Sequence, residues 1–238
     1  MQKIPLYGDG IGCVEYIKHD GSDIDVVNAA RVSFGAHKEE LDDKDVKLIR
    51  YLMSHNHSSP FEHCNITFRF VVPLFIRSQH HRHRTWSYNE ISRRYTSYDI
   101  QFYEPKFFRT QHKSNRQASE DILINPCLND DTRPSILPIP PWTVSNAVCD
   151  HNKRSLELYN KMLKKGVCRE QARGVLPQNT YTQYYGTTDL NNLFKFIALR
   201  LHEGAQWEIQ EVAKACLAIA TDKFPAIAHA WIDQNSLE

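Results

Sequence analysis

Glycine is scarce in this sequence, which contains only 9 glycines among its 238 residues. Neither G-x-G-x-x-G nor a P-loop occurs, and these are the two glycine-rich motifs whose backbone N–H groups cradle nucleotide phosphates. A nucleotide that binds this protein therefore has to be held by side chains and helix ends.

Paired cysteines are also missing. The 6 cysteines lie far apart and form no Cys-x-x-Cys motif, which argues against a zinc cluster and a disulfide framework. His55, His57 and His63 are the other candidate metal ligands. Histidines two residues apart cannot share a helix face, however, and no cluster of carboxylates or thiolates accompanies these three. We expect reduced thiols and no metal site.

Long apolar runs are absent as well. No window of about 18 apolar residues could span a bilayer, and the amino terminus lacks the apolar core of a signal peptide. We therefore expect a cytoplasmic protein without a membrane partner.

An excess of positive charge is lacking too. The sequence contains 29 Lys and Arg residues and 28 Asp and Glu residues, which gives a formal charge of +1. No global basic field exists to attract a polyanion, which argues against nucleic acid as a partner. The length is sufficient for one domain with a substantial core.

What the sequence does have is a dense polar and cationic stretch from Gln79 to Tyr95. It contains four arginines, three histidines and no lysine. Arginine holds phosphate or carboxylate with two parallel hydrogen bonds, so its exclusive use favours ligand recognition. Three interpretations remain open from these residues: a basic surface loop, a platform for single-stranded nucleic acid, and a pocket for a small phosphorylated ligand. The balanced net charge favours the pocket.

Hydrophobic periodicity predicts an α+β fold in a single domain, with helices packed on a small, mainly antiparallel sheet. Residues 65–72 and 181–187 are predicted strands, and a further short strand is expected within 1–16. The segment 105–141 has six prolines and predicts an irregular excursion or lid with at most one short helix. Helices are predicted at about 24–32, from Asp42 or Asp43 to 53, 74–79, 143–165, 169–177, 190–203, 206–221 and 225–233. Pro73 should lie in the first turn of the helix 74–79, Asp189 should cap the helix 190–203, and Trp231 is interpreted as a packing residue.

The predicted helix 190–203 places a cation on its apolar side. At about 100° per residue, Arg200 falls beside Leu193 and Ile197. A guanidinium on an apolar flank requires an anionic or hydrogen-bonding partner. A buried structural ion pair and a role in catalysis are the two interpretations. The predicted helix 143–165 should bury Leu156, Tyr159 and Leu163.

Residues 82–95 read Arg-His-Arg-x-x-Ser-x-Asn-Glu-x-Ser-x-Arg-Tyr, and this pattern resembles the signature of the flavin-dependent thymidylate synthases. Three further stretches are similar to that family: Ala30 to Phe34, Pro60 to His63 and Ala205 to Gln210. The resemblance therefore extends over nearly the whole chain.

The resemblance implies a methyltransferase that converts dUMP to dTMP. FAD, reduced by NADPH, would supply the hydride, and methylenetetrahydrofolate would supply the carbon. It also implies a homotetramer with active sites at subunit interfaces. Arg200 becomes the catalytic candidate, because a cation against the uracil ring would stabilise the negative charge that forms when the imide nitrogen loses its proton.

The resemblance also assigns binding residues. For dUMP they are Gln79, Arg82, Glu90, Ser92, Arg93, Arg94, Arg173 and Arg200, of which Arg82, Arg94 and Arg173 would hold the phosphate. For FAD they are Ser33, His57, Ser59, Glu62, Arg82, His83, Arg84, Asn89, Glu90, Asp189, Asn191 and Lys195.

This sequence departs from the family pattern at several flavin positions. Ser59 stands where threonine is more common, Gly204 stands where a histidine often occurs, and Asp189, Asn191 and Lys195 also differ. These changes put the affinity for FAD in question. Two alternatives to the enzyme remain: an oligonucleotide-binding module, and an inactive scaffold that keeps only the assembly.

Overall fold

The computed structural model describes residues 2–129 and 142–235, so positions 130–141 of the predicted excursion lie outside the described residues. The chain forms two compact units. Unit 1 comprises Met1–Val71, Ser78–Glu90 and Gln183–Glu238, and unit 2 comprises Val72–Arg77 and Ile91–Thr182. Each unit is described by itself below.

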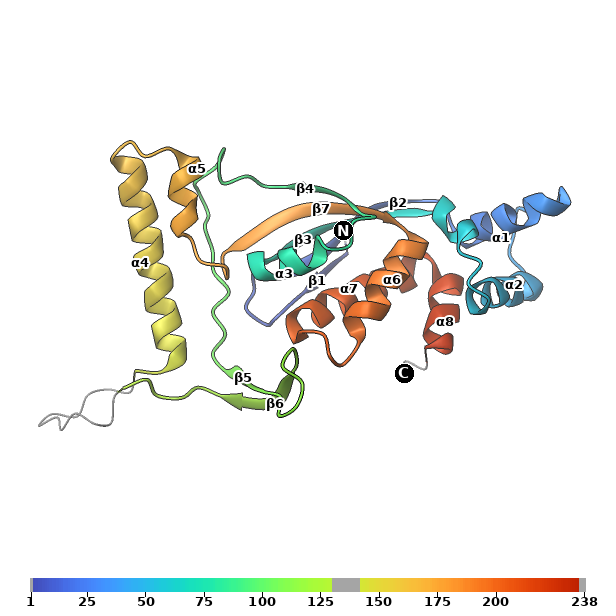
Figure 1. The fold of residues 1–238 in the computed structure, drawn as a ribbon. Helices are drawn as coiled ribbons and strands as arrows, with labels where there is room; N and C mark the ends of the chain where they lie inside the picture. The colour runs from blue at the N-terminus through green and yellow to red at the C-terminus, as the bar shows by residue number, and fades with distance from the viewer. Residues whose placement is uncertain (1, 130–141, 236–238) are drawn as a thin grey trace, which may run out of the picture. The chain divides into compact units, whose positions relative to one another are not determined.

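A five-stranded sheet lies mostly within unit 1 (Figure 1). Its strand order is β1-β2-β3-β7-β4, and the pairs β1 with β2, β2 with β3 and β4 with β7 are antiparallel. The predicted α+β class with a mainly antiparallel sheet is therefore confirmed. The strands are β1 Lys3–Pro5, β2 Cys13–Asp20, β3 Asn65–Pro73, β4 Ser87–Glu90 and β7 Tyr181–Asp189.

Strand β3 provides much of the core of unit 1. Its β-branched and aromatic residues fit a pleated surface, and Ile66, Phe68 and Phe70 are fully buried. Arg69 lies between them in sequence and points to the opposite face, where it forms an ion pair of 2.6 Å with Glu15 of β2. The alternation of apolar and polar residues thus fixes which face of the strand meets the helices.

Helices cover the apolar face of the sheet in unit 1. Figure 1 shows α6 and α7 along this face, and α7 contacts both β2 and α8, while α8 contacts α2. All the helices that we predicted in this unit are present. They are α1 Asp23–Arg31, α2 Asp43–Ser54, α6 Leu190–Leu201, α7 Trp207–Lys223 and α8 Pro225–Gln234, with the short 3₁₀ helices η1 Val32–Phe34 and η2 Ser59–His63.

A carboxylate distant in sequence caps α8. Asp23 of α1 is buried and accepts hydrogen bonds from the backbone N–H groups of Ala226 and Ile227, at 3.0 and 3.1 Å. Burial raises the pKa of Asp23. These bonds satisfy two of the backbone donors that a helix leaves unpaired at its N-terminus, and they join the first helix of the chain to the last.

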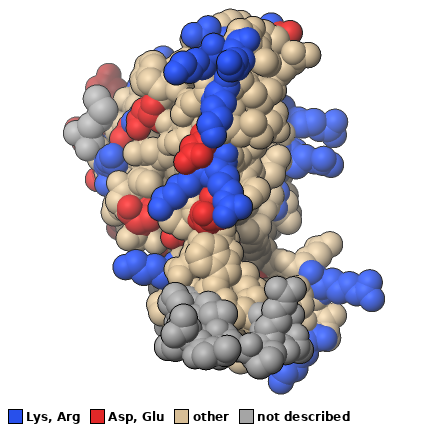
Figure 2. All heavy atoms as spheres, turned by 90° about the vertical axis from the view of Figure 1, so that its left-hand side faces the viewer, with Lys and Arg blue, Asp and Glu red and all other residues tan. Residues whose placement is uncertain are grey.

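Unit 2 contains α4 Val144–Lys164, α5 Arg169–Ala172, the 3₁₀ helix η3 Arg173–Val175 and a two-stranded sheet of β5 Phe108–Gln111 and β6 Ser119–Ile124. On the face of unit 2 in Figure 2, basic side chains are interspersed with acidic ones. On α4, Arg154 pairs with Asp150 at 2.7 Å and Lys161 with Glu157 at 3.8 Å. Such exposed pairs contribute little stability.

Two predictions for unit 2 were wrong. Residues 108–124 form a β-hairpin, because the prolines that suggested irregular structure lie outside it, at Pro105 and from Pro126 onward. On α4 the predicted burial of Tyr159 is confirmed, but Leu156 and Leu163 are only partly buried, and the polar residues Asn152 and Ser155 are buried instead. Glu104 accepts a hydrogen bond of 2.8 Å from Asn152 and makes this polar burial possible.

Helix α3, Leu74–His80, follows β3 directly. Pro73, which we expected in the first turn of this helix, is instead the last residue of the strand. The dense cationic stretch identified in the sequence thus begins at the end of α3. Within the described residues, no helix is long and apolar enough to cross a membrane.

Candidate active site

The turn that follows α3 is fixed by one tyrosine. Tyr88 of β4 donates from its hydroxyl group to the carbonyl oxygens of His80 and His83, at 2.9 and 3.1 Å. Strand β4 is itself paired with β7, so Tyr88 ties the turn to the sheet. The turn therefore presents His83 in a defined position.

His80 lies beneath this turn in an aromatic cluster. Its imidazole is fully buried, and its Nδ1 lies 2.8 Å from the hydroxyl oxygen of Tyr184. The ring centroids of Phe70, Trp86 and Phe196 lie 4.7, 4.5 and 4.6 Å from that of His80. Burial lowers the pKa of His80 well below its ordinary value, so the ring is neutral. The cluster is a rigid base for the residues above it.

Arg200 of α6 meets this turn through two hydrogen bonds. Its Nε–H donates to Nε2 of His83 at 3.1 Å, and its Nη2–H donates to the backbone oxygen of Gln79 at 3.0 Å. Because Nε2 of His83 accepts a hydrogen bond, the proton of the neutral ring is on Nδ1. The structure thus brings together three residues that the sequence assigned to the site.

The positive charge of Arg200 is not neutralised within the described chain. Both acceptors are neutral, and Arg200 forms no ion pair with any residue in 2–129 or 142–235. Burial lowers the pKa of Arg200, yet a guanidinium stays charged at neutral pH. The alternative of a structural ion pair is therefore wrong for the described residues. A half-buried cation without a carboxylate is suited to bind an anion or to stabilise developing negative charge.

A glutamine pair extends the network toward α7. The side-chain amide of Gln79 donates to Oε1 of Gln206 at 2.6 Å, and the amide of Gln206 donates to the buried carboxylate of Glu208 at 2.9 Å. In the sequence, residues 205–210 stood out only as a match to the family, and no role was predicted for Gln206. The carboxylate of Glu208 can only accept, so the amide nitrogen of Gln206 faces Glu208 and its Oε1 faces Gln79. This pairing fixes the orientation of the Gln79 amide.

His83 gives the fold a pH dependence. Burial and, second, Arg200 lower the pKa of His83 to about 4, whereas a histidine in an unfolded chain has a pKa of about 6.5. Between these values the unfolded state binds more protons than the folded state, so the free energy of unfolding falls as pH falls from about 6.5 to 4. We expect His83→Asn to flatten this dependence when unfolding in urea is measured across that range.

The matched control for this experiment is His151→Asn, because His151 is an exposed histidine of α4. It should leave the slope of the unfolding free energy against pH as it is in the wild type. Equal slopes for wild type and His83→Asn would contradict the neutral, hydrogen-bonded state of His83.

A pocket of about 340 Å³ opens elsewhere in unit 1, between α2, α6 and α8. Phe61, Phe194 and Trp231 give it apolar walls, while His57, Asn191 and Lys195 supply polar groups. These three polar residues are all predicted flavin contacts, brought together from segments that are far apart in the sequence. Asn56, Ser58, Gln234 and Asn235 add further polar groups, so the pocket is about as polar as it is apolar. A cleft that combines apolar walls with convergent polar groups can hold a cofactor. Trp231, which we interpreted as a packing residue, is part of the wall.

Two other predicted flavin residues lie beside this pocket and have partners. Glu62 accepts a hydrogen bond of 2.9 Å from the side-chain amide of Asn191. Asp189 caps α6, as the sequence predicted, because its carboxylate accepts from the backbone N–H of Asn192 at 2.9 Å. The cap occupies the Asp189 carboxylate, so this residue helps to place Asn191 and Lys195 at the start of α6.

The remaining predicted residues of unit 1 do not line this pocket. Their side chains are exposed, apart from the half-buried Glu90: Ser33 follows α1, Ser59 lies on η2, Arg82 and Arg84 follow α3, and Asn89 and Glu90 lie on β4. The described residues of unit 1 also contain no group of three or more potential metal ligands.

Unit 2 holds four predicted dUMP residues. Arg93 donates to the backbone oxygens of Tyr98 and Asp99 at 2.8 and 3.3 Å, so it fixes a turn. Ser92 accepts a hydrogen bond from the N–H of Arg94, and the Arg94 side chain lies 3.5 Å from Glu170 of α5. Arg173 is exposed and lies three residues beyond Glu170. Arg94 and Arg173 therefore come near the same short helix, although 78 positions lie between them in the sequence.

Comparison with known proteins adds an independent observation. A family described as thymidylate synthase complementing protein matches residues 15–226. The flavin-dependent thymidylate synthase of Thermus thermophilus is 41% identical over 227 residues, which cover 95% of this chain and 77% of the relative. That of Thermotoga neapolitana is 37% identical over 230 residues, or 97% and 94% of the two chains. The crystal structure of the UMP/dUMP methylase PolB from Streptomyces cacaoi bound with 5-Br dUMP is similar, with a TM-score of 0.77, 30% identity and 97% of each chain covered.

Proposed function

We infer the chemistry of this protein from one premise: the chain belongs to the family of flavin-dependent thymidylate synthases. It is an FAD-dependent methyltransferase that converts dUMP to dTMP by reductive methylation. The family signature at 82–95 begins just after α3 and includes β4. The rest of the proposal concerns the roles of individual residues.

The observation that carries the proposal is the arrangement of Arg200. Its guanidinium is half-buried, is held by two neutral acceptors and keeps its charge uncompensated in the described chain. Loss of the imide proton of uracil places negative charge on the ring and makes carbon 5 more nucleophilic. A cation fixed in advance stabilises that charge without reorganisation, and this is electrostatic catalysis. Arg200 is therefore the catalytic residue of the proposal.

The pocket between α2, α6 and α8 supports the binding of FAD. Its apolar walls fit a planar aromatic group, and His57, Asn191 and Lys195 provide hydrogen bonds and one positive charge for a phosphate. Lys195 compensates for the lack of a glycine-rich phosphate loop. When bound and reduced, FAD supplies the hydride that completes the methyl group. Ser33, Ser59, Glu62, Arg82, His83, Arg84, Asn89, Glu90 and Asp189 remain proposed contributors to this binding.

Recognition of the dUMP phosphate is proposed for Arg82, Arg94 and Arg173. A dianion requires several cationic forks, and each of these three side chains is exposed. Gln79, Glu90, Ser92 and Arg93 are proposed to bind or to position dUMP. For Gln79 the support is the network with Gln206 and Glu208, which leaves its amide in one orientation.

NADPH as reductant, methylenetetrahydrofolate as carbon donor and a homotetramer with active sites at subunit interfaces complete the proposal. They rest on the family membership. Assembly would also account for exposed apolar residues such as Phe34 and Tyr95, which lie in the described chain without cover.

The experiment that tests the function is a visible absorption spectrum of the full-length protein with FAD, recorded before and after addition of dUMP. We expect the bands of bound flavin, and we expect dUMP at micromolar concentration to shift them because the proposed homotetramer would bring both ligands together at a subunit interface. Inorganic phosphate at the same concentration should leave the bands unchanged. UMP, added in a separate titration, measures whether the site selects the deoxyribose.

Each outcome distinguishes the candidate functions. Bound flavin with a dUMP-dependent shift supports the synthase, and formation of dTMP with NADPH and methylenetetrahydrofolate then tests the co-substrates. A protein that binds neither FAD nor dUMP contradicts the enzyme and supports the inactive scaffold. Affinity for single-stranded oligonucleotides that falls steeply with salt would support the nucleic-acid module instead.

A further inference from the structure

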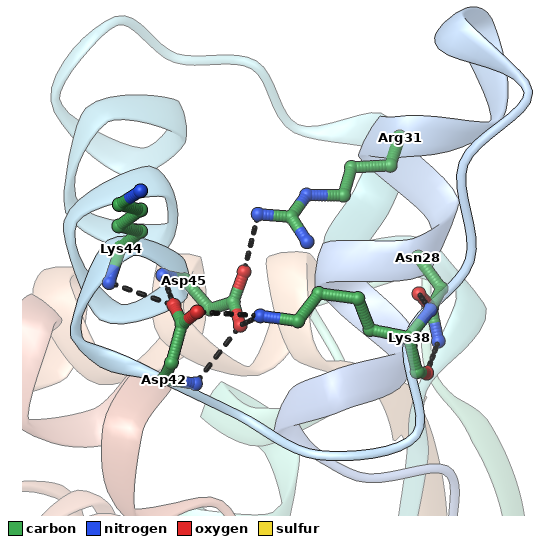
Figure 3. A network of polar contacts seen from close by, with 6 residues as sticks. All are labelled: Asn28, Arg31, Lys38, Asp42, Lys44 and Asp45. Atoms are coloured by element: carbon green, nitrogen blue, oxygen red, sulfur yellow. Dashed lines mark hydrogen bonds and ion pairs between the residues drawn. The ribbon is translucent and has the colours of Figure 1, made fainter.

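The loop between α1 and α2 has a fixed base and an exposed tip. It runs from Arg31 to Lys38 and includes η1 (Figure 3). At the tip, Val32 and Phe34 expose 73% and 87% of their surface, and Ser33 between them is exposed as well. Gly35 has φ 63°, a left-handed conformation that suits glycine and turns the chain back toward α2. The tip thus buries almost nothing in unit 1.

Asp45 of α2 holds the base of this loop. Its side chain is fully buried, and its two oxygens meet cations from the two ends of the loop, as Figure 3 shows. Oδ1 pairs with Arg31 at 2.5 Å, and Oδ2 pairs with Lys38 at 2.5 Å. Oδ2 also accepts a hydrogen bond from the backbone N–H of Asp42 at 2.9 Å. One carboxylate therefore closes the loop.

Further contacts reinforce the closure at Lys38. The side chain of Asn28 donates to the backbone oxygen of Lys38 and accepts from its N–H, at 2.8 and 2.9 Å. The ammonium group of Lys38 also pairs with Asp42 at 2.8 Å. The hydrogen bond from the Lys38 ammonium group is the largest cause that lowers the pKa of Asp42, to about 2. Asp42 therefore stays ionised at any pH at which the protein would be assayed.

Starting a helix does not require this network. Asp42 and Asp45 form a capping box for α2 through backbone N–H groups alone. The backbone hydrogen bonds of this cap come from Asp42, Lys44 and Asp45 and do not involve Arg31 or Lys38. A buried ion pair adds little net stability, because desolvation offsets the attraction, but it selects one geometry. Here the ion pairs of Asp45 select one geometry of the loop. The tip of this loop has no packing partner in unit 1, so these ion pairs determine the position of the tip.

We propose that Asp45 is a positioning residue of the flavin site, which holds the Arg31–Lys38 loop so that Ser33 can contact FAD. This inference rests on the proposed function, in which Ser33 is a flavin contact. Without the carboxylate, Arg31 and Lys38 lose their common anchor, the loop samples many conformations, and FAD must order it on binding. That ordering lowers affinity without removing any atom that touches the flavin.

The primary test compares Asp45→Asn with the wild-type protein in FAD titrations followed by flavin fluorescence. We expect the dissociation constant to rise about tenfold, and hydrogen exchange of the backbone N–H groups of 32–37 to accelerate. The matched control is Asp43→Asn, which removes an exposed carboxylate from the same helical turn and should change neither quantity. Lys38→Met is a second variant in case Asp45→Asn folds poorly, because it loosens one end of the loop and leaves the pair of Arg31 and Asp45 intact.

A double-mutant cycle separates positioning from a general loss of stability. Ser33→Ala should weaken FAD binding, and adding Asp45→Asn should weaken it by less than a further twofold, because Asp45 acts through Ser33. Multiplicative effects of the two changes would overturn the inference, as would unchanged FAD affinity in both Asp45→Asn and Lys38→Met. If the wild-type protein itself does not bind FAD, the proposed function fails and the inference fails with it.

Discussion

Replacing Arg200 by alanine is expected to lower kcat for dTMP formation by about 10³-fold, the effect of removing one preorganised group that stabilises transition-state charge. Arg200→Lys should recover only about a tenth of the lost kcat. An ammonium group cannot donate to both His83 and Gln79 while it faces a ligand. The measurement is single-turnover dTMP formation, with binding of dUMP followed separately by the flavin spectrum.

The control for this prediction is Arg154→Ala, which removes an arginine from the exposed side of α4. It should leave kcat and the dUMP-dependent spectral shift unchanged. If Arg200→Ala retained more than a tenth of the wild-type kcat, Arg200 would be a structural residue. The proposal that its charge stabilises the uracil anion would then be contradicted. A rise in KM alone would show that the guanidinium binds substrate and transition state equally well.

Phe70→Ala is expected to have the largest effect on stability, a loss of about 4 kcal/mol in the free energy of unfolding. The ring of Phe70 is fully buried among His80, Trp86 and Tyr184, with centroids 4.7, 6.1 and 5.1 Å away. The ring also packs closely against Gly186, since a Cβ at Gly186 would lie 3.0 Å from Phe70. Removing the ring leaves a cavity that this rigid cluster cannot fill.

Urea unfolding measures this loss, and Phe107→Ala is the matched control. Phe107 is 58% exposed, so its truncation should cost less than about 1 kcal/mol. A small effect of Phe70→Ala would mean that the aromatic cluster relaxes, and His80 would then not be a rigid base for the turn that carries His83. At temperatures where Phe70→Ala is still folded, we also expect weaker retention of FAD.

Local pattern was sufficient to predict most of the elements and the position of Arg200 on the apolar side of α6. The apolar spacing of Leu193 and Ile197 predicted α6, and the same spacing placed Arg200 beside them. Asp189 was recognised as the cap of that helix, and the cap is present. In each case successive residues of the signal lie three or four positions apart, which is the spacing over which helix geometry acts.

Long-range partners could not be predicted. The acceptor for Arg200 is His83, 117 positions earlier, and no periodicity links the two. The polar side of α4 is a similar case, since burying Asn152 is favourable only because Glu104 is there to accept its hydrogen bond. The family resemblance did name His83, Gln79 and Arg200, but it gave neither their contacts nor the role of Asp45. Which of the named residues touch FAD and dUMP stays a prediction.

Unit 1 is discontinuous, and this affects how the protein is made. Strand β3 ends its first segment, while its neighbour β7 and the helix capped by Asp23 belong to the last. At ribosomal rates of about 5 to 20 residues per second, roughly ten seconds separate the synthesis of Val71 from that of Gln183. During that interval the edge of β3 that later pairs with β7 has unpaired backbone N–H and C=O groups and is open to wrong pairings. A stop codon before the codon for Ala226 would remove both backbone N–H groups that the Asp23 carboxylate caps, and these lie 203 and 204 positions later in the sequence.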